Sequence, residues 1–142
     1  MTSPTCIHHI NFIVADLKAS VASYKQLLDI GPFEYEDLPM RGVSTARVLL
    51  GATWLVLVCP QNTDSVPGRY LEQHGEGFFL LSFGVDNLDQ ALQHFEKRGL
   101  LKPDAAIRQG LMDWRVIDLK TEAKLGAKFH LTEVAPSPKK NG

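Results

Sequence analysis

The amino-acid sequence predicts an α+β fold made of two β-α-β-β-β modules in tandem, which together form one curved mixed sheet. The first observation is a change of period in "CIHHINFIVADLKASVASYKQLLDIG", residues 6–31, from alternating apolar residues to the spacing of a helix face. The second is a repeat of this strand–cap–helix pattern in "FFLLSFGVDNLDQALQHFEKRG", residues 78–99, where Phe12 corresponds to Phe83 and Asp16 to Asn87. A repeat over such a distance indicates two copies of one structural unit.

The first module, residues 6–59, opens with a strand that continues to Val14 and then changes to a helix. Asp16 has a side chain that accepts hydrogen bonds from the free N–H groups of a first helical turn, so we expect it to cap this helix. Gly31 is expected to close the element. The helix positions expected to face a core are Leu17, Val21, Tyr24, Leu27 and Leu28.

Three more strands are expected in each module, because runs of β-branched and aromatic residues follow each helix and are separated by turn residues. In the first module these runs lie at 33–38, 43–50 and 53–59. The second module, residues 77–134, begins with a strand at 78–85 and a helix from Leu88, and its later strands are expected at 105–109, 113–119 and 127–134.

We expect a single domain over residues 1–142, in which both modules share one sheet. The linker, residues 60–76, is expected to contain one short helical turn around Tyr70 to Gln73, and the polar tail, residues 135–142, is expected to be frayed. If both helices cover one face of the sheet, the other face is left free and two such sheets side by side curve into a trough.

Composition and charge exclude several classes of partner. The formal net charge of −1 gives no field that would gather nucleic acid or an anionic membrane surface, so neither partner is expected. The longest apolar run is far shorter than the roughly 20 residues of a membrane helix. The start "MTSPTCIHHI" lacks the pattern of a signal peptide, and Cys6 and Cys59 show no disulfide spacing, so we expect a cytoplasmic protein with reduced thiols.

The paired modules, together with "HHINFIVADLKASVASYKQLL", resemble the vicinal oxygen chelate superfamily, the glyoxalase/bleomycin-resistance/dioxygenase group. The resemblance covers about residues 6–134. The pattern most similar to this chain is that of the methylmalonyl-CoA epimerases, in "YLEQHGEGFFLLSFGVDNLDQAL". The resemblance implies the glyoxalase/bleomycin-resistance-type fold and a small-molecule site in the trough.

In metal-using members, the first and last strands of each module supply one metal ligand apiece. Carried over to this chain, the four positions are occupied by His9, Val56, Leu80 and His130. A catalytic metal needs about three protein ligands and an open position, and two aliphatic side chains cannot supply them. The resemblance therefore implies an incomplete metal site, with His9 and His130 as metal ligands only if a metal is bound, and no cofactor is expected.

Alternation along the strands predicts which side chains line the trough. Trp54 and Val56 share one strand face, as do Phe78, Leu80 and Ser82, and Asn11 and the two histidines add polar groups. Arg47 and Arg115 occupy equivalent places in "ARVLL" and "WRVID"; they either hold an anionic ligand group together or pair with Glu34, Glu36 or Asp113. The predicted ligand-binding residues are His9, Asn11, Arg47, Trp54, Val56, Phe78, Leu80, Arg115 and His130.

Two hypotheses of function follow. The first is a superfamily member that encloses a small organic molecule, aromatic or anionic, without a complete metal site. The second is a divalent-metal-dependent lyase or isomerase, similar to glyoxalase I or methylmalonyl-CoA epimerase, that uses His9 and His130. Relatives in the superfamily commonly pair, and the edge run 33–38 needs cover, so a homodimer is expected. A third class, a structural or regulatory partner, would have its trough filled by its own side chains.

Overall fold

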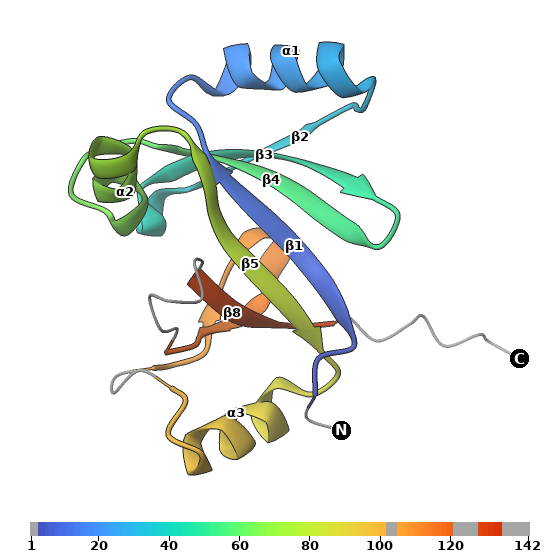
Figure 1. The fold of residues 1–142 in the computed structure, drawn as a ribbon, viewed down its shortest axis with the longest axis vertical. Helices are drawn as coiled ribbons and strands as arrows, with labels where there is room; N and C mark the ends of the chain where they lie inside the picture. The colour runs from blue at the N-terminus through green and yellow to red at the C-terminus, as the bar shows by residue number, and fades with distance from the viewer. Residues whose placement is uncertain (1–2, 102–104, 121–127, 135–142) are drawn as a thin grey trace, which may run out of the picture. The chain divides into compact units, whose positions relative to one another are not determined.

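The computed structural model of the protein describes residues 3–101, 105–120 and 128–134 (Figure 1). The helices of this part of the chain are α1 (Leu17–Leu28), α2 (Val66–His74) and α3 (Leu88–Lys97), with single 3-10 turns η1 (Pro39–Arg41) and η2 (Leu111–Asp113). The strands are β1 (Cys6–Ile13), β2 (Glu34–Leu38), β3 (Val43–Leu50), β4 (Thr53–Pro60), β5 (Gly77–Val85), β6 (Arg108–Gln109), β7 (Arg115–Asp118) and β8 (Lys128–Glu133).

Hydrogen bonding orders the strands as β2-β3-β4-β1-β5-β8-β7-β6. The sheet is mixed, because β1 runs parallel to β4 whereas β2–β3, β3–β4, β6–β7 and β7–β8 are antiparallel. Both modules show the predicted order of strand, helix and three strands, with α2 between them. The predicted α+β fold of two β-α-β-β-β modules is confirmed.

Contacts divide the chain into two compact units whose limits fall inside strands. The N-terminal unit is His9–Leu81, and the C-terminal unit combines Met1–His8 with Ser82–Gly142. The limits lie within β1 and within β5, so each of these strands contributes to both units, whereas the sequence predicts modules at 6–59 and 77–134. That the two modules make one domain stays a prediction.

The core of the N-terminal unit lies between α1 and one face of its strands. Asp16 caps α1 as predicted, since its carboxylate accepts a hydrogen bond from the backbone N–H of Ala19 at 3.0 Å. In Figure 1, α1 lies along the strands β2, β3 and β4. The buried core residues are Val14, Val21, Phe33, Ala46, Val48, Leu55 and Leu57.

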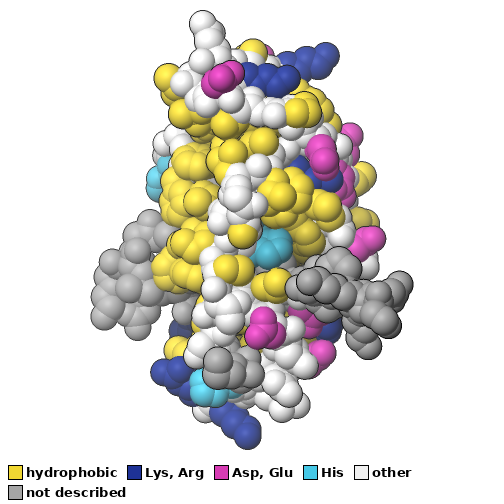
Figure 2. Space-filling view, turned by 90° about the vertical axis from the view of Figure 1, so that its right-hand side faces the viewer, with side chains coloured by type: hydrophobic (Ala, Val, Ile, Leu, Met, Phe, Trp, Pro, Cys, Tyr) yellow, Lys and Arg dark blue, Asp and Glu magenta, His cyan; other side chains and the backbone are white. Residues whose placement is uncertain are grey.

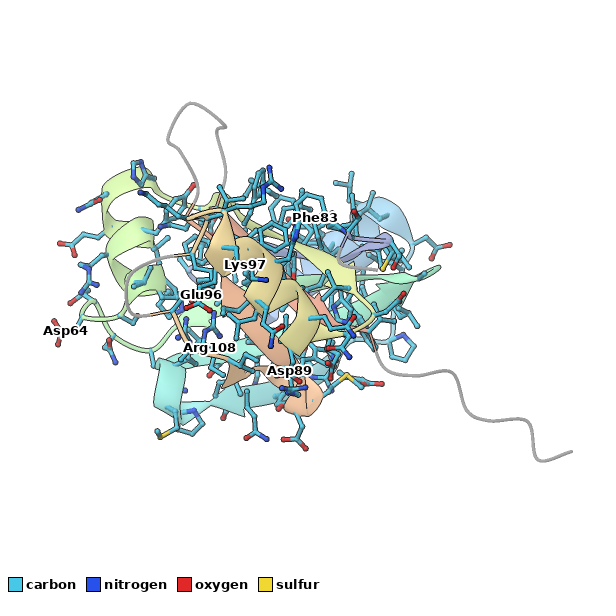
Figure 3. The ribbon with its side chains drawn as sticks, turned by 90° about the horizontal axis from the view of Figure 1, so that it is seen from below. Asp64, Phe83, Asp89, Glu96, Lys97 and Arg108 are labelled. Carbon is cyan, nitrogen blue, oxygen red and sulfur yellow. The ribbon has the colours of Figure 1, made fainter. Side chains whose placement is uncertain are left out.

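The C-terminal unit has an equivalent core beneath α3. Asn87 caps α3 through the backbone N–H of Gln90 at 3.0 Å, and Glu133 accepts from the backbone N–H of Leu88 at 2.9 Å. Phe83, labelled in Figure 3, packs edge-to-face on the ring of Phe129 at a centroid distance of 5.4 Å. The buried core residues are Val85, Leu88, Ala91, Ile117 and Leu131.

Three local predictions differ from the structure. In the linker, the expected single helical turn is the nine-residue helix α2, because Ser65 caps it through the backbone N–H of Gly68 and a proline stands in its first turn. Helix α1 ends at Leu28, before Gly31, and its C-cap is Asp29, which adopts the left-handed conformation with φ 54°. Strands β6 and β7 are shorter than expected, and the tail 135–142 lies outside the described residues.

Candidate ligand-binding face

The predicted ligand-binding residues of the N-terminal unit gather on the face of its strands that is turned away from α1, which we call the far face. Leu55 and Leu57 belong to the core under α1, so their neighbours Trp54 and Val56 point the opposite way. The register then places His9 beside Trp54, and both Asn11 and Arg47 beside Val56. Five of the predicted residues therefore share one face: His9, Asn11, Arg47, Trp54 and Val56.

Arg47 is held on this face by ion pairs within its own unit. Its side chain is only 9% exposed, and its terminal nitrogens Nη1 and Nη2 donate to Glu36 at 2.6 Å and to Glu34 at 3.1 Å. The guanidinium carbon lies 5.6 Å from the ring centroid of Trp54, within range of a cation–π contact. The third nitrogen, Nε, is buried and has no hydrogen-bond partner in the described structure. Of the two predicted arrangements for Arg47, the structure shows the pairing with Glu34 and Glu36.

Of the remaining groups on the far face, Val56 and His9 are buried, whereas Asn11 and Trp54 are half-buried. Val56 has no exposed surface, and His9 is 3% exposed. The side-chain oxygen Oδ1 of Asn11 is buried without a hydrogen-bond partner in the described structure. Such an atom is costly to leave unpaired, so it is a candidate for contact with a ligand that donates a hydrogen bond.

Phe78 and Leu80 come from β5 of the same unit. The ring of Phe78 contacts that of Phe12 at 5.8 Å in a T-shaped arrangement, and Phe12 packs against the core under α1. Phe78 therefore lies beside a ring that packs on the core under α1. Leu80 is buried, with 6% of its surface exposed. That either residue touches a ligand stays a prediction.

One cavity in the N-terminal unit, of about 400 Å³, lies on the α1 side and not on the far face. Its polar lining includes Asp16, Ser20, Tyr24 and Glu76. Burial, followed by the charge of Glu76, raises the pKa of the Tyr24 hydroxyl above its ordinary value. Glu76 is anchored through a hydrogen bond from the backbone N–H of Ala15 at 2.8 Å. This cavity contains none of the predicted ligand-binding residues.

In the C-terminal unit, His130 stands in a group of buried polar side chains. The hydroxyls of Ser82 and Thr132 are 2.7 Å apart, and the Ser82 hydroxyl donates to the backbone carbonyl of His130 at 3.3 Å. Asp118 is the cross-strand partner of His130, and its carboxylate pairs with Arg108 at 3.1 Å (Figure 3 labels Arg108). Thr132 is not among the predicted ligand-binding residues, although its alternation with His130 along one strand places both side chains on the same face.

Arg115 points to the helix side of its strand, whereas Arg47 lies on the face turned away from the helix. Its guanidinium donates to Glu133 at 3.0 Å and to Asp89, on the first turn of α3, at 3.1 Å (Asp89 is labelled in Figure 3). Hydrogen bonds to Asp89 and Glu133 raise the pKa of the guanidinium. Ile117, two residues along β7, belongs to the core under α3, so Arg115 points to the helix side of its strand. Its predicted contact with a ligand stays a prediction.

The residues at the four superfamily metal positions do not fit a divalent metal. Of the three positions in the N-terminal unit, His9 alone has a ligating side chain, and Val56 and Leu80 are buried aliphatic residues. The fourth of these metal positions, His130, belongs to the C-terminal unit. Over residues 3–101, 105–120 and 128–134, no group of three or more His, Cys, Asp or Glu side chains has the geometry to hold a metal ion.

The profile of the Glyoxalase/Bleomycin resistance protein/Dioxygenase superfamily matches residues 8–117. Among curated proteins, the human mitochondrial methylmalonyl-CoA epimerase is 29% identical over 105 residues, which are 73% of this chain and 60% of the human protein. This chain therefore spans about 60% of the length of that relative.

Solved structures of epimerases are also similar. A variant of the Streptomyces coelicolor methylmalonyl-CoA epimerase in complex with 2-nitronate-propionyl-CoA is 28% identical, with a TM-score of 0.86 over 94% of this chain and all of that one. A methylmalonyl-CoA epimerase in complex with methylmalonyl-CoA and NH4+ is 29% identical, with a TM-score of 0.87 over 96% of this chain.

No helix in the described part of the chain is both long enough and apolar enough to span a bilayer. The fold and the profile agree with the resemblance seen in the sequence, and the match extends over most of the chain. This chain belongs to the glyoxalase/bleomycin resistance protein/dioxygenase superfamily, and its similar solved structures include methylmalonyl-CoA epimerases.

Proposed function

We propose that this chain binds a small organic molecule with a carbonyl group on the far face of its N-terminal unit, and that binding needs no metal at the superfamily's ligand positions. Acyl-CoA thioesters are the first class to test, because the solved structures similar to this chain hold methylmalonyl-CoA and 2-nitronate-propionyl-CoA. The residues that would contact the acyl group are His9, Asn11, Trp54 and Val56.

The observation that carries this proposal is the burial of aliphatic side chains at metal positions. Val56 has no exposed surface and Leu80 has 6%, so a divalent ion bound to His9 would face hydrocarbon on two sides. A charge in such surroundings is strongly disfavoured. The same surroundings favour an apolar acyl chain, since burying one methylene group contributes about 0.8 kcal/mol.

Hydrogen bonds would orient the carbonyl group. A neutral imidazole offers one donor and one acceptor, so His9 can donate to a carbonyl or enol oxygen. The indole of Trp54, which already lies beside Arg47, offers a flat surface to an unsaturated or aromatic group. Proton transfer by an imidazole near neutral pH is compatible with an isomerase reaction of a carbonyl compound.

A second candidate function is supported by the similarity to epimerases. In this case a divalent metal would bind His9 and His130 with additional ligands, and the chain would epimerise a branched acyl thioester. The exchange of a substrate C–H proton for deuterium in D2O, in the presence of added Co2+, Mn2+ or Zn2+, is the activity that would favour this candidate.

Calorimetric titration of the untagged full chain with propionyl-CoA, before and after treatment with EDTA, separates the two candidates. The proposal predicts that EDTA changes the dissociation constant by less than about twofold, because no ligand contact passes through a metal. Binding that disappears with EDTA and returns with one equivalent of a divalent metal would contradict the proposal and favour the epimerase-like candidate.

We also propose that the chain forms a homodimer. Several large hydrophobic side chains are exposed in the N-terminal unit, among them Met40 at 97% and Leu27 at 80%. Figure 2 shows hydrophobic side chains at the surface of one face of the molecule. Among the described strands, β2 lies at the edge of the sheet order next to β3, and such an edge is commonly covered. Light scattering at micromolar concentration is the test, and a mass of only 15.8 kDa would contradict the dimer.

A further inference from the structure

Arg47 is the one formally charged residue among the predicted ligand-contacting residues of the N-terminal unit, and its charge is already compensated. Its two terminal nitrogens donate to the carboxylates of Glu36 and Glu34, and its remaining nitrogen Nε is buried out of contact with water. A guanidinium holds a carboxylate by presenting two parallel N–H groups. Two of the five N–H groups of Arg47 are already used in this way, and the three side chains together carry one positive and two negative charges, so a carboxylate on the far face would meet a net negative charge.

Two other groups on the far face, Asn11 and Val56, also disfavour a negative charge. The buried Oδ1 of Asn11 carries a partial negative charge, and Val56 offers hydrocarbon only. An ionised carboxylate placed between these groups would lose its water without gaining a cation, which is among the most costly changes in a protein interior. A hydroxyl or amide N–H, in contrast, would pair with Asn11.

We infer that the ligand of this chain is uncharged where it lies on the far face, so that the protein selects a monoacyl thioester over a malonyl-type thioester. This inference rests on the proposed function and adds a specificity to it. Glu34 and Glu36 are then specificity-determining residues, because they neutralise the arginine that would otherwise attract a carboxylate.

The first test compares two ligands that differ in a single carboxylate, propionyl-CoA and methylmalonyl-CoA, by calorimetry on the EDTA-treated full chain. We expect propionyl-CoA to bind at least about tenfold more tightly, the size of one unpaired charged contact. Equal affinity, or a preference for methylmalonyl-CoA, would overturn the inference while leaving metal-free binding of a thioester intact.

The second test removes the compensating charges with the double variant Glu34→Gln/Glu36→Gln. Both glutamines still accept hydrogen bonds from Arg47, but its positive charge is no longer neutralised. We expect the affinity for methylmalonyl-CoA to rise at least about tenfold and that for propionyl-CoA to stay within about twofold. The matched control is Glu72→Gln on α2, which should change neither affinity. A double variant that still disfavours methylmalonyl-CoA, with an unchanged melting temperature, would contradict the role of Glu34 and Glu36.

A third measurement needs no thioester and therefore stands even if the proposed function is wrong. Sodium acetate is titrated into isotope-labelled protein, and the Nε–H resonance of Arg47 is followed by NMR at constant ionic strength. We expect no saturable shift in the parent chain and a saturable shift in the double variant. A saturable shift in the parent chain would show that Arg47 is open to carboxylates and would overturn the inference, whatever the thioesters do.

Discussion

The two modules of the chain share the start of their helices but differ in the faces that their strands present. Asp16 and Asn87 cap α1 and α3 in the same way, each accepting from the backbone N–H three residues later at 3.0 Å. Arg47 and Arg115 also occupy matching places in the sequence, yet Arg47 lies on the face away from α1 and Arg115 bonds to Asp89 on α3. The helix caps are thus the same in both modules, whereas the two matching arginines lie on opposite faces of their strands.

The reason for the difference is the pairing of each strand with its neighbours. In the β3–β4 pair, Arg47 itself lies opposite Val56. In the β7–β8 pair, it is Val116, the residue after Arg115, that lies opposite Thr132. A shift of one residue in register reverses every side chain on a strand. The N-terminal unit consequently has a buried arginine on its far face, and the C-terminal unit has its arginine on the helix side.

The largest expected effect concerns the two buried histidines and ligand affinity. We expect His9→Ala to weaken the binding of propionyl-CoA by about 1.5–3 kcal/mol, or roughly ten- to a hundredfold, because a hydrogen bond to the carbonyl oxygen is lost. His130→Ala tests the predicted histidine of the C-terminal unit; because the proposed site lies on the N-terminal unit, we expect its dissociation constant to stay within about twofold of that of the parent. Calorimetry measures both variants, and a His9→Ala variant that binds propionyl-CoA like the parent would contradict the hydrogen bond from His9.

The next effect compares the two arginines by their influence on stability. Arg47→Met should lower the free energy of unfolding by about 1–2 kcal/mol, a value reduced because Glu34 is largely exposed and Glu36 partly so. Arg115→Met should have a much smaller effect, since Arg115 and Asp89 are well exposed. Urea unfolding at neutral pH gives both values. Equal losses would mean that burial does not distinguish the two sites.

The helix caps should respond equally in the two modules. Asp16→Ala and Asn87→Ala each remove the acceptor of one N–H group in a first helical turn. We expect each to cost about 1 kcal/mol of unfolding free energy, with the two values within about 0.5 kcal/mol of each other. Thermal unfolding followed by circular dichroism is the measurement, and a loss confined to one variant would show that the modules differ in their helices as well.

The smallest expected effect is on the rate at which the Cys59 thiol is alkylated. Burial, the largest cause, raises the pKa of the Cys59 thiol above its ordinary value of 9.0, and the charges of Asp16 and Glu76 add to the shift. Because the folded state retains the proton, native stability from this group is present below about pH 9 and is lost as the pH rises further. We expect iodoacetamide to alkylate Cys59 more slowly than an unstructured cysteine peptide at pH 8, as measured by mass spectrometry. A rate equal to that of the peptide would contradict a half-buried, protonated thiol.

Much of the fold could be predicted because its signals are local. The change of period at Leu17, the cap at Asp16 and their copies at Leu88 and Asn87 require no knowledge of distant contacts. Helix α2 was underestimated although Ser65 and Pro67 form a recognisable start. The face of Arg115 could not be predicted, since it depends on which residue of another strand lies opposite.

The sequence predicts the residue types at the candidate site, but it does not predict which groups pair with the charge of Arg47. The aliphatic residues Val56 and Leu80 at two metal positions are visible in the sequence once the resemblance is known. The sequence left open whether Arg47 would hold a ligand or pair with Glu34 and Glu36. Alternation along β2 allowed both glutamates to share the face of Arg47, but the two ion pairs depend on the register of β2 with β3, in which Glu34 lies opposite Arg47.

A titration with Co2+ tests the central claim, that aliphatic residues have replaced the metal site of the superfamily. The absorption of visible light by protein-bound Co2+ is followed in the untagged parent chain and in the variant Val56→Gln/Leu80→His, which brings the ligands of the N-terminal unit to three. We predict no saturable band in the parent and a saturable band in the variant, because about three protein ligands are needed to hold the ion. One equivalent of Co2+ bound by the parent, and lost in His9→Ala, would contradict the account.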